Sequence, residues 1–381
     1  MSTIPLDYQT LRLIWWLLLG VLLIGFAIMG GRDLGVGALL PFAARTDDER
    51  RVLLNLIGPT WEGNQVWLIL GGGAIFAAFP PLYAVSFSGF YLAMIVILLA
   101  LILRPVGFKF RGKIEDARWR AVWDWGLFVG GFVPALIMGV AVGNVLLGAP
   151  FHFDDSMRVF YTGNFFQLLM PFALLAGLVS VGMIATHGAT LIVGRTEGVV
   201  ADRARTIGLW SGIATIILFA LGGVWVAFMN GYVVTSVIDP AAPINPLAKT
   251  VELVPGGWLS NYGAHPWMIA APVLGFAGMA AAVLGLMGRK RWAAYLGSSV
   301  GIFGIVATAG VSIFPFFLPS STVPNAGLTL WDASSSHMTL FIMLLCTLVF
   351  LPIVLAYTAW VFRVMRGTVT SDSLSKNPNA Y

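Results

Sequence analysis

Long apolar runs recur along the whole chain and constrain its fold more than any other feature of the sequence. Each run of about 20 residues, coiled as an α-helix, is long enough to cross the roughly 30 Å hydrocarbon core of a bilayer. The composition agrees, because 58% of the 381 residues are hydrophobic and only 10% are charged, whereas soluble proteins carry about 25% charged residues. The sequence therefore predicts an all-α polytopic membrane protein.

The runs divide into about nine predicted transmembrane helices, and basic residues orient them. Nineteen of the 22 Lys and Arg residues fall on one side of the membrane if the chain crosses it nine times. Short basic loops are retained in the cytoplasm, so we expect the N-terminus outside and the C-terminus inside. The predicted spans are about 11–42, 60–79, 82–103, 122–147, 163–193, 207–230, 267–287, 293–316 and 338–363.

A weak internal repeat suggests how these spans are grouped. Gly25–Gly37 resembles Gly182–Gly194, mainly in its Gly and Leu positions. We expect a first four-helix bundle at 1–147, a second at 148–316, and a ninth, peripheral helix with a flexible polar tail at 317–381. The outward loop 231–266 carries Pro240, Pro243, Pro246 and Pro255, and we expect it to be ordered against a partner or the protein's own helices.

The sequence offers little for cofactor chemistry. It has four histidines, none placed as an obvious pair across two facing helices, and a single cysteine, Cys346. We therefore expect no haem held by this chain alone, no metal site and no catalytic residue. The basic groups lie at helix ends instead of forming a stripe, which argues against nucleic acid as a partner.

The acid with the most functional promise is Glu62, at the start of the second predicted span. Gln65 lies three residues on, and Asn64 and Trp67 form a second pair at the same spacing. An ionisable group there is costly unless it faces protein or water. Glu62 could thus exchange protons at a cytoplasmic mouth, or it could be a solvated acid favoured by the helix dipole; the residues alone leave both open.

Other acids have simpler interpretations. Asp33 could add to the same path, or could be a structural group bonded to Arg32 or to backbone. We expect Asp124 to form a structural ion pair with Arg104, and Asp332 or a neighbouring serine to cap the last helix.

Many segments resemble subunit II of the cytochrome bd family of quinol oxidases, in order and over nearly the whole chain. One of them, Trp61–Trp67 (WEGNQVW), matches the family pattern W-[DE]-G-N-Q-x-W. The other matching segments are Leu11–Trp16, Asp33–Gly37, Phe87–Tyr91, Arg104–Phe108, Trp123–Gly126, Tyr161–Gln167, Gly222–Trp225, Phe314–Pro315, Pro319–Thr322 and Leu328–Ala333.

The resemblance implies a terminal oxidase of the bacterial cytoplasmic (inner) membrane that reduces O₂ to water with electrons from quinol and generates a proton motive force. In that family haems b558, b595 and d belong to subunit I, the partner of this chain. A bound quinone, a small single-span accessory subunit and membrane lipid are further expected contacts. The match places Glu62 at the start of a cytoplasmic proton path toward subunit I.

One departure concerns the end of the first span. Family members often read D-G-F-D-L-G-V-G there, whereas this chain reads Gly30–Gly37 (GGRDLGVG). An acid and an aromatic residue are missing and Arg32 adjoins Asp33, so a proton-transfer role for Asp33 is less well supported than one for Glu62.

A secondary transporter and a structural scaffold are the alternatives to an oxidase subunit. A secondary transporter would place charged groups near the midplane of two corresponding spans, whereas the ionisable groups here cluster at helix ends. A purely structural scaffold would give Glu62 no role, and turnover of a Glu62 variant separates it from the oxidase subunit.

Overall fold

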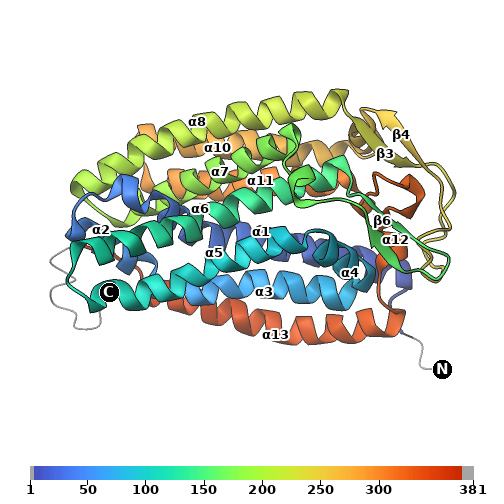
Figure 1. Ribbon diagram of the computed structural model, residues 1–381, viewed down its shortest axis with the longest axis horizontal. Coiled ribbons are helices and arrows are strands. Elements are labelled where there is room, and N and C mark those ends of the chain that lie inside the picture. Colours follow the sequence, from blue (N-terminus) through green and yellow to red (C-terminus); the bar gives the residue numbers. More distant parts are fainter. Residues whose placement is uncertain (1–3, 371–381) are drawn as a thin grey trace.

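The computed structural model describes residues 4–370, and the tail expected at the C-terminus lies largely outside that range. Long helices run side by side along one axis, with α2 at one end of the bundle and the short strands at the other (Figure 1). Each of the nine predicted spans corresponds to helix. Their bounds are α1 Tyr8–Ala43, α3 Trp61–Ala78, α4 Pro80–Gly89 followed by α5 Tyr91–Phe110, α6 Ala117–Leu147, α7 Pro171–Arg195, α8 Gly198–Phe228, α10 Ala270–Met287, α11 Arg291–Ile313 and α13 His337–Val364.

Eight helices in the described range are long and apolar enough to cross a membrane. The predicted span that is not among them is α3, which has 18 residues. Its first turns carry Glu62, Asn64 and Gln65, and Gly71–Gly73 follow, so its mean hydropathy is low for a span. The class of an all-α polytopic membrane protein is confirmed.

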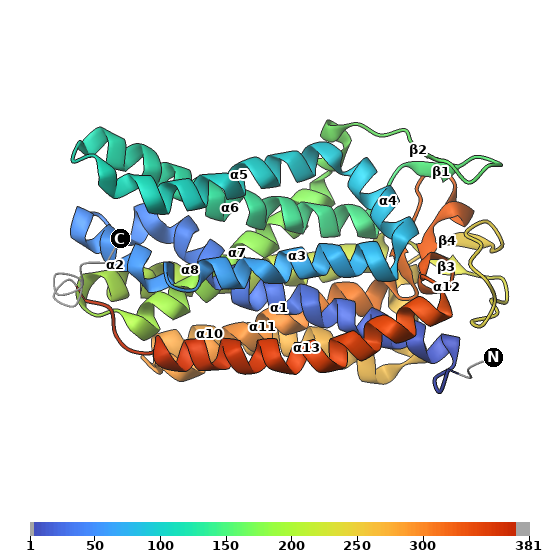
Figure 2. The same cartoon turned by 90° about the horizontal axis from the view of Figure 1, so that it is seen from below.

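The helices pack in an order that follows the chain. Helix α1 packs against α3 and α6, and α5 packs against α6; α7 packs against α8, α8 against α10, and α10 against α11. Contacts of α1 with α7 and α11, and of α6 with α7, join these two groups, while α13 runs beside α1 (Figure 2). The division into units at 147/148 and 316/317 stays a prediction.

Glycine lets α1 and α7 approach backbone to backbone. A Cβ added at Gly188 would lie 2.6 Å from the Val36 nitrogen and 2.7 Å from the Gly35 Cα. A Cβ at Gly35 would in turn lie 2.9 Å from the Gly188 Cα. Real Cβ atoms do not approach so closely, so only glycine permits this helix crossing.

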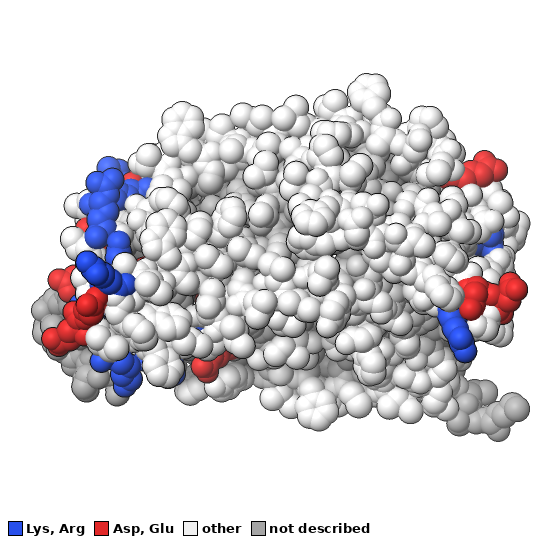
Figure 3. All heavy atoms as spheres, viewed as in Figure 1, with Lys and Arg blue, Asp and Glu red and all other residues white. Residues whose placement is uncertain are grey.

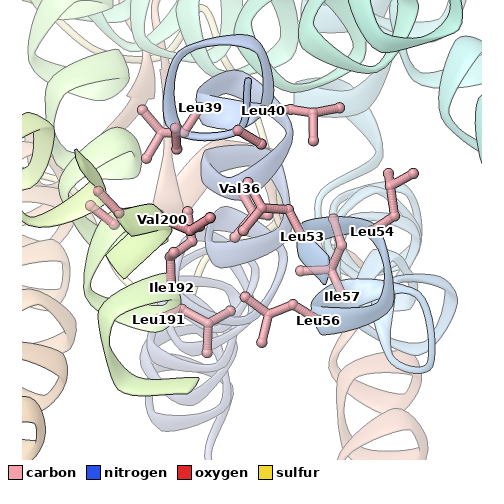
Figure 4. Close-up of a cluster of buried hydrophobic side chains, with 14 of the residues drawn as sticks. Val36, Leu39, Leu40, Leu53, Leu54, Leu56, Ile57, Leu191, Ile192 and Val200 are labelled. Carbon is pink, nitrogen blue, oxygen red and sulfur yellow. The ribbon is translucent and has the colours of Figure 1, made fainter. Parts of the chain in front are cut away.

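A helix that the sequence analysis missed, α2 (Asp47–Ile57), lies at one end of the bundle. Thr46 and Glu49 form a reciprocal capping box at its start. Its apolar face packs on residues of α1, α7 and α8 (Figure 4). The labelled side chains are Val36, Leu39, Leu40, Leu53, Leu54, Leu56, Ile57, Leu191, Ile192 and Val200.

Charged side chains gather strongly at the end that holds α2, which we call the basic end. In the space-filling view the middle of the visible face is almost free of charge (Figure 3). Such a band suits a hydrocarbon environment. The chain is therefore built as a multi-pass protein of the membrane.

Three short antiparallel hairpins cover the opposite end. They are β1 (Phe151–Phe153) with β2 (Val159–Tyr161), β3 (Asn230–Val234) with β4 (Val251–Pro255), and β5 (Phe316–Leu318) with β6 (Leu328–Thr329). The expected order of the 231–266 loop comes from the protein's own helices: the Trp258 side chain is 1% exposed, and its indole N–H donates to the Leu146 carbonyl at 3.1 Å.

Asp332 belongs to this covered end, in the short helix α12 (Leu330–Ala333). Its carboxylate lies 2.7 Å from the Lys249 ammonium, and both side chains are buried. Desolvation raises the pKa of Asp332 and lowers that of Lys249. The cap of α13 is Ser336, one of the serines expected there, whose hydroxyl accepts from the Thr339 N–H.

Candidate functional site

Glu62 lies in the first turn of α3 and is exposed in this chain. The next residues on the same face, Val66 and Ile69, are 44% and 69% exposed. The carboxylate therefore sits at the edge of an apolar helix face. A charged group on such a face is costly against lipid and needs a partner or water.

Asn64 and Trp67 point the other way and are buried. The Asn64 side-chain amide donates to Asp33 Oδ2 at 2.6 Å. Asp33 precedes the end of α1 by ten residues, which corresponds to about 15 Å along the helix axis. The start of α3 is therefore set inward from the basic end, as Figure 2 shows, and Glu62 lies roughly 12 Å inside the end of α1.

A buried polar cluster surrounds this contact. Arg32 Nε lies 3.7 Å from Asp33 Oδ1, and both side chains are at most 8% exposed. Arg104, 3% exposed, donates to Gln65 Oε1 at 3.5 Å and acts electrostatically on Asp33. The cluster thus joins α1, α3 and α5 through Arg32, Asp33, Asn64, Gln65 and Arg104.

Several polar atoms of the cluster lack hydrogen-bond partners among residues 4–370. They are Asp33 Oδ1, Arg32 Nε and NH2, and Arg104 NH2. Buried donors and acceptors of this kind are normally satisfied by ordered water. The cluster therefore has the chemistry to hold water next to Glu62.

The two tryptophans of the motif frame the cluster without joining it. Trp61 stacks on Phe108 with ring centroids 5.2 Å apart, and the Arg104 guanidinium lies 5.5 Å from the Trp61 ring. Trp67 packs in the apolar core, where a Cβ added at Gly25 would lie 2.6 Å from its ring. Its position is that of a core residue.

The expected ion pair between Arg104 and Asp124 was wrong. Asp124 accepts from Arg111 Nε at 2.6 Å and from Arg50 at 2.8 Å. The reason is the length of α5, which continues to Phe110 and brings Arg111 level with Asp124. Arg104 lies deeper, opposite Gly130, where an added Cβ would be 2.6 Å from its Cγ.

The fully buried histidine does not suit a haem ligand. His187 Nδ1 lies 2.8 Å from the Ser298 hydroxyl, and Nε2 lies 3.0 Å from the Ile28 carbonyl. Its ring also stacks on Tyr295 at 5.2 Å. Both ring nitrogens are thus engaged in joining α7 to α11 and α1, and iron ligation would break one of these bonds.

The fold defines an all-α, multi-pass integral membrane protein with a polar cluster beside one short helix. The family model of cytochrome bd terminal oxidase subunit II matches residues 11–365. The chain is 51% identical to the cytochrome bd-I ubiquinol oxidase subunit 2 of Escherichia coli K12, covering 98% of this chain and 99% of the relative. It is 48% identical to a probable cytochrome oxidase subunit 2 of Haemophilus influenzae over the same shares.

A solved structure supports the fold. The bd oxidase from Geobacillus thermodenitrificans matches with a TM-score of 0.69 at 16% identity, covering 93% of this chain and 98% of the other. The chain belongs to the cytochrome bd terminal oxidase subunit II family. It is a component of an oxidoreductase complex of the inner membrane, in which subunit I is its partner.

Proposed function

We propose that this chain supplies protons from the cytoplasm to a ubiquinol oxidase in which subunit I carries the redox centres. Glu62 takes up the proton, and the polar cluster beside it holds the water that carries the proton inward. The net reaction is oxidation of quinol and reduction of O₂ to water. Because protons for water formation come from one side of the membrane, turnover generates a proton motive force without pumping.

The observation that carries this proposal is the setting of Glu62. It is a carboxylate on an apolar, exposed helix face, well inside the end of the bundle. Facing lipid, an ionised group at such a depth is strongly unfavourable. Subunit I, seated on this face of α3, would cover it and turn it inward toward the redox centres.

The buried polar cluster also supports the proposal, because it has polar atoms available to water. Asp33 Oδ1 and Arg104 NH2 offer an acceptor and a donor that water can bridge, since neither has a hydrogen-bond partner in the described chain. Asn64 and Arg32 fix the Asp33 carboxylate from two directions. We therefore assign proton exchange to Glu62 and the ordering of water to Asp33, Asn64, Gln65 and Arg104.

The remaining features of the assembly follow from family membership. We propose that haems b558, b595 and d lie in subunit I, that quinol is oxidised there, and that a bound quinone and a small single-span subunit complete the complex. We also propose that the basic end faces the cytoplasm, which places the N-terminus outside. The charge distribution supports this orientation, because short basic connections resist translocation.

Glu62→Gln in the purified two-subunit oxidase tests the proposal. We expect O₂ consumption with a short-chain ubiquinol to fall about tenfold or more, since a positioned proton donor typically contributes about 10²–10⁴-fold, while haem content stays normal. Glu62→Asp should retain most activity, because it keeps the carboxylate. The matched control is Glu115→Gln, an exposed acid in the connection between α5 and α6, which should behave as wild type.

Unchanged turnover in Glu62→Gln would refute the proton role and leave a scaffold function. Proton uptake in proteoliposomes gives an independent readout. The variant should slow uptake and O₂ consumption in parallel, since both depend on the same path.

A further inference from the structure

A pocket of about 580 Å³ opens at the basic end, and its lining includes no residue of the Glu62 cluster. It lies between α2, the short 3-10 turn η1 (Arg111–Lys113) and the start of α6. Its lining includes one carboxylate, Asp47, and five cationic side chains. The cationic residues are Arg51, Lys109, Arg111, Lys113 and Arg120.

Ion pairs within the pocket occupy that carboxylate. Arg111 donates to Asp47 Oδ1 at 2.7 Å, and Arg120 donates to Asp47 Oδ2 at 2.9 Å. Both oxygens of Asp47 are therefore engaged. Arg120 Nε is buried and has no hydrogen-bond partner among the residues that the structure describes. The pocket thus retains net positive charge, because five cationic side chains line it with one carboxylate.

Local contacts hold the pocket in shape. Asp116 caps α6 by accepting from the backbone N–H groups of Arg118 and Trp119, at 2.6 and 3.1 Å. The Trp119 indole donates to the Phe110 carbonyl at 2.9 Å, which ties the end of α5 to the start of α6. These contacts already hold the backbone around the pocket, so a ligand would need to order few residues. The entropic cost of binding is lowered accordingly.

Apolar groups continue the lining toward the side of the bundle. Leu54 and Phe108 line the pocket and are buried, while Phe110 is 50% exposed. Ile114, in the same connection, is 48% exposed. Cations beside exposed apolar side chains at the end of a membrane bundle match an amphipathic anion, with a phosphate at one end and acyl chains at the other.

We propose that this pocket binds the phosphate headgroup of an anionic phospholipid. The phosphate oxygens accept from Arg120, Lys109 and Lys113, and an acyl chain lies along Phe110 and Ile114. Guanidinium and ammonium groups form strong charge-assisted hydrogen bonds with phosphate. Such a lipid would fix the connection between α5 and α6 to α2.

The experiment is native mass spectrometry of the purified two-subunit oxidase titrated with phosphatidylglycerol. The test variant is Lys109→Gln with Lys113→Gln. The matched control is Lys290→Gln with Arg291→Gln, which removes two charges from the basic end outside the pocket. We expect one phosphatidylglycerol to bind wild type and control alike, and the test variant to bind it about tenfold more weakly. Equal melting temperatures and haem content establish that all three proteins are folded.

Three results would overturn the proposal. One is equal affinity of the test variant and wild type for phosphatidylglycerol. Another is displacement of the lipid by an equal concentration of inorganic phosphate, which would identify a site for soluble phosphate. The third is equally tight binding of phosphatidylcholine, which would show that the acyl chains alone determine binding.

Discussion

Gly188→Ala tests how closely α1 and α7 are packed. The new methyl group would lie 2.6 Å from the Val36 nitrogen and 2.7 Å from the Gly35 Cα. Ordinary contact between such atoms begins near 3.5 Å, so the two helices must separate by about 1 Å. Overpacking of this kind costs about 1–3 kcal/mol.

The separation has a second cost through the neighbouring residue. His187 Nε2 lies 3.0 Å from the Ile28 carbonyl of α1, and a further 1 Å, approximately, would break this buried hydrogen bond. Loss of such a bond costs about 1–3 kcal/mol. The two effects together predict a destabilisation of about 2–6 kcal/mol.

The assay is thermal unfolding of the purified complex followed by tryptophan fluorescence. We expect the midpoint to fall by about 5 °C. Gly194→Ala on the same helix is the matched control, because the structure places no described atom within 4 Å of its added Cβ. That variant should match wild type or gain up to about 1 kcal/mol from the better helix propensity of Ala. A midpoint for Gly188→Ala within about 1 °C of wild type would refute the reasoning about close packing.

Two further predictions concern polar contacts. Asp124→Asn removes the shared partner of Arg50 and the buried Arg111, so we expect a loss of about 3–5 kcal/mol in the thermal melt; an unchanged melt would mean that these ion pairs carry no stability. Burial raises the pKa of Tyr232 from 10.0 to about 12. The unfolded chain therefore loses this proton first, and stability should fall by about 2–3 kcal/mol as the pH rises from 10 to 12. Denaturant melts should show a shallower fall in Tyr232→Phe, and equal slopes would contradict the raised pKa.

Much of the fold could be predicted from the sequence, because apolar runs and basic clusters report directly on spans and their ends. All nine predicted spans correspond to helix, with boundaries shifted by up to nine residues. The helix α2 was missed because it is only 11 residues long and begins with five charged residues. The capping pattern from Thr46 to Glu49 was nevertheless present in the sequence and could have revealed it.

The candidate site was less predictable, because its contacts depend on the relative depth of helices. The partner of Asp124 is Arg111 and not the predicted Arg104, because α5 extends about two turns beyond its predicted end. The contact between Asn64 and Asp33 requires α3 to begin inward of α2, which no local pattern specifies. Glu62, Asn64 and Gln65 were identifiable from the motif, whereas the participation of Arg104 and the mutual geometry of the cluster were not.

The central position of α1 has a consequence for how the protein is made. This helix leaves the ribosome before the other helices described here, yet it carries Arg32 and Asp33, and Asn64, the partner of Asp33, is synthesised later. Helices α11 and α13, which also contact α1, are synthesised about 15–60 s after α1 at ordinary translation rates. We therefore expect nascent α1 to stay beside the insertion machinery, sheltered from bulk lipid, until the rest of the chain has been delivered.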